Sequence, residues 1–248
     1  MKKIILLIVA ILSVTACAQQ TEKKNYLKKE NLNGKVKSIR EIEYIVTIKD
    51  DKIEKKQIRK MQFSQYDKEG KKVEEQFYKP NGKPDVKHTH KYDEKGDLVR
   101  IEAEWADFVG LFTGLNIYTY DNKGNLIEEE TYDSEKFVYK YDEKGNLVER
   151  SQLFDEDKRE KTLYKYDDEG NKIEAYIYNS DEVLQFKSTY MYDKKGNLVE
   201  EIRDHDSEGY TLEIEYKYEY DSYGNWIRKI LTYDDYPESI TEREIEYY

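Results

Sequence analysis

Aromatic side chains are the residues of this sequence whose type and spacing best suit a binding chemistry. There are 25 tyrosines against 7 phenylalanines. Tyr218, Tyr220, Trp226 and Arg228 fall on two neighbouring predicted strands, and we expect Arg228 to project beside Trp226. Such rings can stack on sugars while the guanidinium bonds to sugar hydroxyls. The alternative, favoured by the regular tyrosine spacing, is that the rings only fill the concave side of a sheet.

A second candidate is the apolar run WADFVGLFTGL at 105–115, in a chain that is otherwise highly charged. An exposed apolar loop usually marks contact with a partner or a membrane, which makes Phe108 and Phe112 candidate binding residues. The other interpretation is that these side chains fold back and plug the sheet. The residues leave both open.

No set of residues indicates catalysis. A nucleophile needs a base and an orienting group beside it, and no Ser-His-Asp or Cys-His set can be identified. His88 and His90 alternate on one predicted strand, but no third metal ligand accompanies them. The Asp-rich turns each offer one carboxylate, whereas calcium needs several converging oxygens. We therefore expect a protein that is not an enzyme and that has no cofactor or metal.

The first residues have the pattern of a bacterial lipoprotein signal. Lys2 and Lys3 precede an apolar stretch at 4–12, and Val-Thr-Ala leads into Cys17. This pattern predicts a signal peptide over 1–16, followed by lipid attachment to the Cys17 thiol. Cys17 is the single cysteine of the sequence, so a disulfide within the chain is excluded. The polar stretch that follows predicts a flexible tether over 17–31.

The charge balance limits the possible partners. The formal net charge is −11, and removal of Lys2 and Lys3 would make the chain more acidic still. A field of this sign repels nucleic acid, so we expect no nucleic-acid partner. The predicted membrane contact is therefore made by lipid on Cys17. The oligomeric state cannot be read from the sequence.

A short motif, Tyr-Asp-x-x-Gly, recurs through the chain and sets its architecture. Its glycines tolerate positive φ, and its aspartates favour the first position of a type I turn, so each copy predicts a hairpin turn with a bulge. In the copy at 140–149, we expect Tyr141 to face Leu147 and Tyr139 to face Glu149. The seven copies begin at Tyr66, Tyr92, Tyr120, Tyr141, Tyr166, Tyr192 and Tyr220.

These turns predict an all-β fold over residues 32–248. The strands between them, about sixteen in all, form an antiparallel meander of repeated β-hairpins. The meander begins with a hairpin at 36–48 and 53–63. Because 38% of the residues are charged, a thick two-layer core is not expected. We expect a single twisted or coiled repeat sheet whose charged terminal strands guard its edges.

The Tyr-Asp-x-x-Gly-Asn-Leu motif resembles the YD repeats of the RHS family. The nearer resemblance is to short RHS-repeat lipoproteins of Bacteroidota-like bacteria, of unknown function, and it covers about residues 32–233. Two further stretches carry it, LNGKVKSIREIEY at 32–44 and YDSYGNWIRK at 220–229. The resemblance implies a hairpin-repeat fold and implies little about activity.

Together these patterns predict an exported protein that is anchored by lipid in the bacterial cell envelope, with the outer membrane favoured and its face left open. The first hypothesis for its role is a module that binds a glycan or protein ligand. The alternatives are a structural subunit or spacer of an envelope complex, and an accessory or immunity protein associated with a toxin.

Overall fold

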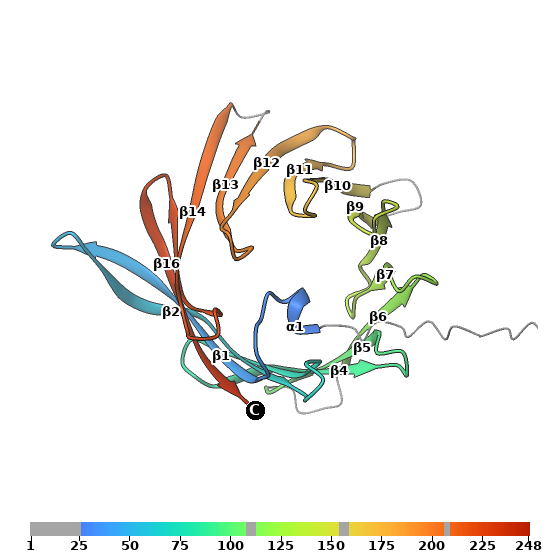
Figure 1. The fold of residues 1–248 in the computed structure, drawn as a ribbon, viewed down its shortest axis with the longest axis horizontal. Helices are drawn as coiled ribbons and strands as arrows, with labels where there is room; N and C mark the ends of the chain where they lie inside the picture. The colour runs from blue at the N-terminus through green and yellow to red at the C-terminus, as the bar shows by residue number, and fades with distance from the viewer. Residues whose placement is uncertain (1–25, 108–112, 154–158, 206–208) are drawn as a thin grey trace, which may run out of the picture.

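A computed structural model describes residues 26–107, 113–153, 159–205 and 209–248. Cys17, Phe108 and Phe112 lie outside this described part. Within it the chain forms one short helix and sixteen antiparallel strands (Figure 1). These are α1 (Tyr26–Lys29), β1 (Val36–Lys49), β2 (Lys52–Tyr66), β3 (Lys72–Tyr78), β4 (Pro84–Tyr92), β5 (Leu98–Trp105), β6 (Thr113–Tyr120), β7 (Leu126–Glu130), β8 (Lys136–Tyr141), β9 (Leu147–Leu153), β10 (Arg159–Tyr166), β11 (Lys172–Tyr178), β12 (Leu184–Tyr192), β13 (Leu198–His205), β14 (Tyr210–Tyr220), β15 (Trp226–Tyr233) and β16 (Tyr236–Tyr247).

The repeated motif makes the predicted hairpin turns, as the copy between β8 and β9 illustrates. The Asp142 carboxylate accepts hydrogen bonds from the backbone N–H of Asn146 at 2.8 Å and from its side-chain amide at 2.9 Å. Gly145 has φ of 88°, which a residue with a Cβ rarely adopts. Asp and Gly are therefore required by the turn itself.

One residue of each returning strand bulges, and this changes the predicted pairing. Tyr141 faces Leu147 as predicted, but the register shifts so that Tyr139 faces Arg150 and not Glu149. The extra residue in β9 moves the later side chains of that strand to the opposite face, because side chains alternate along a strand.

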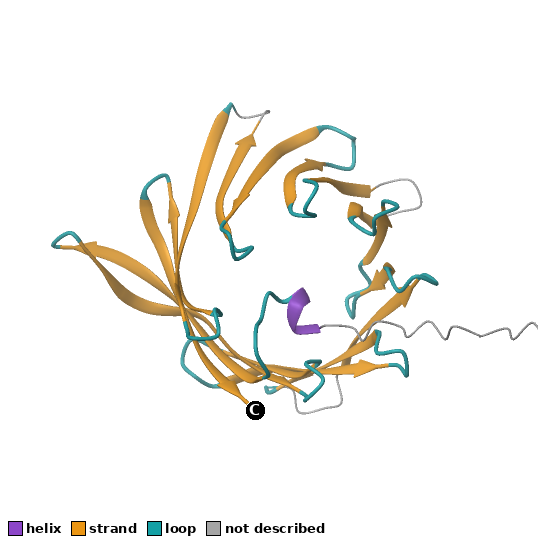
Figure 2. Cartoon of the chain, viewed as in Figure 1, coloured by secondary structure: helices purple, strands orange, loops and turns teal. Residues whose placement is uncertain are grey.

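The sheet closes on itself, so the expected open sheet is wrong. Strand β1 pairs with β16 from Ser38 opposite Glu246 to Ile45 opposite Ser239, and all sixteen strands form one closed barrel (Figure 2). The charges expected to guard free edges form ion pairs across this seam, such as Arg40 with Glu244 at 3.2 Å. Closure removes both edges and satisfies their backbone groups.

Residues 26–35, which we call the strap, run inside the ring (Figure 1). The Tyr26 hydroxyl donates to the Gly96 carbonyl at 2.8 Å, in the turn after β4. The Asn31 amide donates to Asn197 Oδ1 at 2.8 Å, in the turn after β12 on the opposite side of the ring. Residues 26–31 of the stretch expected to be a flexible tether therefore pack into the barrel and bridge its walls.

A small apolar core fixes the strap to the barrel. Leu32, Val36, Ile39 and Tyr66 are each at most 6% exposed and form one cluster. Leu27 of the strap and Ile245 of β16 pack against it. Because the strap lies inside the ring, the face that carries Ile39, Tyr66 and Ile245 is the inner wall of the barrel, and the opposite face is its outer wall.

The register places the repeated tyrosines on this inner wall. Their hydroxyls also connect one repeat to the one before it, where a phenylalanine could not. Tyr92 donates to the Lys72 carbonyl at 2.7 Å, Tyr120 to the Leu98 carbonyl and Tyr166 to the Leu147 carbonyl, both at 2.8 Å. This bonding gives the tyrosines a structural role, which their regular spacing had favoured.

Candidate functional site

Trp226 lies on the inner wall at the start of β15, opposite Tyr220 on β14. The guanidinium carbon of Arg243 lies 3.4 Å from the centre of its ring, and Lys229 Nζ lies 5.1 Å from it. The Tyr218 ring is 6.0 Å away, tilted by 56°. We call Tyr218, Trp226, Lys229 and Arg243 the tryptophan cluster. Two of its members, Lys229 and Arg243, were not among the residues predicted from the sequence.

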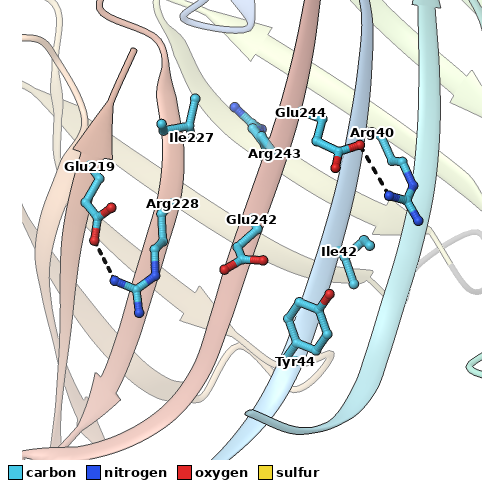
Figure 3. A pocket seen from close by; sticks show the side chains of 9 residues that line it. All are labelled: Arg40, Ile42, Tyr44, Glu219, Ile227, Arg228, Glu242, Arg243 and Glu244. Atoms are coloured by element: carbon cyan, nitrogen blue, oxygen red, sulfur yellow. Dashed lines mark hydrogen bonds and ion pairs between the residues drawn. The ribbon is translucent and has the colours of Figure 1, made fainter. Parts of the chain in front are cut away.

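The predicted partner Arg228 lies on the other side of the sheet. A register shift between Glu219 and Tyr220 puts Trp226 opposite Tyr220 but Arg228 opposite Glu219, so Trp226 and Arg228 point to different faces. Arg228 forms an ion pair with Glu219 and helps to line a shallow hollow of about 310 Å³ on the outer wall (Figure 3). The expectation that Arg228 projects beside Trp226 is therefore wrong. The bulge takes Arg228 to the outer wall and brings Lys229 to the inner one.

The two predicted tyrosines lie next to one another, with ring centres 6.1 Å apart. Each hydroxyl is already bonded within the protein. Tyr218 donates to the Leu198 carbonyl at 2.8 Å, and Tyr220 donates to Asp193 Oδ2 at 2.6 Å. Burial, together with the Asp193 carboxylate, raises the pKa of Tyr220 to about 12. What the pair can offer to a ligand is therefore ring surface more than a free hydroxyl.

A carboxylate holds the arginine of the tryptophan cluster in place. Arg243 Nε donates to Glu41 Oε2 at 2.7 Å, and both side chains are less than one-fifth exposed. The same carboxylate accepts a bond from the Gln62 amide at 3.4 Å. A planar guanidinium fixed over an indole leaves an ordered, partly apolar surface on the inner wall. Such a surface can bind a ring with polar substituents.

A second cluster of charges on the inner wall ties the strap to β3. Glu75 accepts from Lys72 Nζ at 2.9 Å, and His90 Nε2 lies 3.3 Å from its other oxygen. Lys72 also pairs with Glu30 of the strap at 3.2 Å. Burial alone would raise the pKa of Glu75, but the bonds to His90 and Lys72 outweigh burial and lower it to about 2.

This shift predicts how acid affects stability. Since the pKa of Glu75 is lower in the folded protein than in the unfolded chain, its contribution is present above about pH 4.5 and is lost as the pH falls towards 2. The free energy of unfolding should fall less on acidification in Glu75→Gln than in the wild-type protein, by about 2 to 3 kcal/mol, as measured by urea unfolding at pH 6, 4 and 3. Glu130→Gln, at an exposed pair, is the control, and an equal change in both variants would contradict the assignment.

The described residues contain neither a metal-binding cluster nor a membrane-spanning helix. Among the described residues, no group of three or more His, Cys, Asp or Glu side chains is placed to hold a metal ion. In the same residues, no helix is long and apolar enough to cross a membrane.

Comparison with known proteins establishes the fold and leaves the family open. A family model described as an uncharacterised protein matches residues 134–230, and no curated protein matches significantly. A porin-like protein from Bacteroides uniformis has a TM-score of 0.54 at 12% identity, over 85% of this chain and 96% of that one. A porin-like protein from Bacteroides vulgatus gives 0.37 at 13%, over 86% and 98%. The Tc holotoxin pore of Photorhabdus luminescens gives 0.32 at 14%, over 72% and 12%.

Proposed function

We propose that this protein is a non-enzymatic lipoprotein of the cell envelope, related to the short RHS-repeat lipoproteins, whose barrel binds a glycan on its inner wall. The observation that carries the binding role is the tryptophan cluster, where a charged guanidinium stacks at 3.4 Å on an indole inside the barrel. Tyrosines that only hold repeats together do not require this arrangement. Flat aromatic surfaces edged by polar groups are the usual platform for sugar rings.

The position of the strap, close in sequence to Cys17, favours one orientation of the anchored protein. Eight residues separate Cys17 from Tyr26, and an extended chain reaches at most about 3.6 Å per residue, or roughly 30 Å. If lipid is attached to Cys17, the rim that carries the Tyr-Asp turns is held within that distance of the bilayer. The opposite mouth then points away from the membrane.

The charged side chains of the outer wall favour a barrel that is surrounded by water. The Bacteroides uniformis protein of similar fold is nevertheless described as porin-like. Ion pairs cover this wall, among them Lys87 with Glu74, Lys140 with Glu149 and Lys187 with Glu174, at 2.7 to 2.9 Å. On the lipid-facing side of a membrane barrel, each Lys or Arg near the midplane costs about 2 to 4 kcal/mol. We therefore infer that the protein is attached to the membrane by the covalent lipid on Cys17 and that the bilayer does not contact the strands.

The binding role predicts opposite results for two neighbouring residues. Trp226→Ala should weaken glycan binding by about tenfold, because ring stacking together with the apolar area it buries is worth about 1.4 kcal/mol. Arg228→Ala, on the outer wall, should leave affinity unchanged. Glycan-array screening followed by calorimetry on the hits measures both. Equal loss in the two variants, or array binding that survives Trp226→Ala, would contradict the site.

A further inference from the structure

Two lysines on the inner wall, Lys229 and Lys172, carry positive charges that no described side chain neutralises. Lys229 Nζ lies 5.1 Å from the Trp226 ring centre. Lys172 Nζ lies 4.1 Å from the ring centre of Tyr190 and 5.5 Å from that of Tyr164. Neither ammonium group forms a hydrogen bond or ion pair within the described residues, although Lys229 lies over one aromatic ring and Lys172 over two.

Lys72, on the same inner wall, is a lysine whose charge is balanced by carboxylates. It is half-buried like the other two, but it bonds to Glu75 at 2.9 Å and to Glu30 at 3.2 Å. Burial favours a lower pKa for Lys72, yet these two carboxylates raise it above its ordinary value. For Lys229 and Lys172 burial dominates and the pKa of each is lowered. A half-buried charge without a partner is costly to keep, so its presence calls for a reason.

The carboxylates whose charge acts on these two lysines are already occupied. For Lys229 they are Glu41, which accepts from Arg243 at 2.7 Å, and Glu43, which accepts from Arg59 at 3.1 Å. Glu201, near Lys172, accepts from Arg203 at 2.8 Å and from the buried Ser188 hydroxyl at 2.9 Å. Lys229 also experiences repulsion from Arg243 on the same indole. Each lysine therefore keeps unmatched positive charge beside a flat ring.

We propose that the ligand of the inner wall is an acidic glycan, whose sugar ring stacks on Trp226 and whose carboxylate pairs with Lys229. A second acidic sugar of the same chain would meet Lys172 between Tyr164 and Tyr190. This inference rests on the proposed binding function and adds the charge of the ligand to it. A neutral sugar could use the rings but would leave both ammonium groups unpaired, whereas a carboxylate removes that cost on binding.

The test compares tetragalacturonate with its neutral methyl ester by calorimetry on the full chain. Wild-type protein should bind the acid at least about tenfold more tightly than the ester. Lys229→Gln should reduce that preference, the double variant Lys172→Gln and Lys229→Gln should abolish it, and Trp226→Ala should weaken both ligands. Lys217→Gln is the control, since Lys217 lies on the outer wall with 71% of its side chain exposed. Circular dichroism confirms that each variant folds.

The outcomes separate this inference from the proposed function. If acid and ester bind equally to the wild-type protein, or if the double variant Lys172→Gln and Lys229→Gln keeps the preference for acid, glycan binding stands and the acidic ligand is overturned. If oligoglutamate binds as tightly as tetragalacturonate, the wall recognises acids in general and the sugar part is overturned. If the glycan array and both galacturonate ligands show no binding, the two proposals fail together.

Discussion

Tyr66→Ala is expected to destabilise the barrel by about 3 to 5 kcal/mol, the usual cost of removing a buried aromatic side chain. Tyr66 is 4% exposed and packs with Leu32, Val36 and Ile39, where the strap, the first strand and the seam meet. Its hydroxyl also donates to Glu30 Oε2 at 2.6 Å. Urea unfolding followed by circular dichroism gives the free energy directly.

Tyr66→Phe separates the ring from the hydroxyl. It keeps the packing and removes one hydrogen bond to a carboxylate that still pairs with Lys72, so the expected loss is only about 1 to 2 kcal/mol. A loss below 1 kcal/mol for Tyr66→Ala would mean that this cluster does not hold the barrel together.

The second large effect is expected from the strap. The triple variant Tyr26→Ala, Leu27→Ala and Leu32→Ala removes its apolar contacts and should cost about 4 to 6 kcal/mol. Hydrogen exchange should quicken in the turns that it bridges, around Gly96 and Asn197, because those turns lose their partners.

A matched control removes similar groups from exposed positions. Ile48, Val183 and Tyr236 are each more than half exposed, so replacing all three by alanine should change stability by less than about 1 kcal/mol. If the strap variant and this control unfold alike, the strap is not docked in the barrel in solution.

The hairpins of this fold could be predicted because their cause is local. Asp142 and Gly145 satisfy one turn by themselves, and the same residue types recur in the other copies. The number of strands and the opening hairpin followed from that spacing. Closure could not be predicted in the same way, since it depends on twist accumulated over all sixteen strands and on the register between the first and the last.

The candidate site was predicted in part for a related reason. Trp226 and Tyr218 come together as their hairpin implies. One bulged residue, invisible to simple alternation, exchanged Arg228 for Lys229 on the inner wall. Arg243 comes from β16, the strand that pairs next to β15. Glu41 comes from β1 and meets Arg243 only because the barrel is closed. The strap was missed because Tyr26, Leu27 and Leu32 are sparse apolar residues in a polar stretch without periodicity.

Closure of the barrel by β1 and β16 is the claim on which the inner wall, the strap and the candidate site all depend. Amide–amide NOEs measured on deuterated protein test it most directly. The structure predicts NOEs between the two strands along their paired residues, from Ser38 and Glu246 to Ile45 and Ser239, with slow exchange of both strands. Fast-exchanging amides without such NOEs would show two free edges and would contradict a closed barrel.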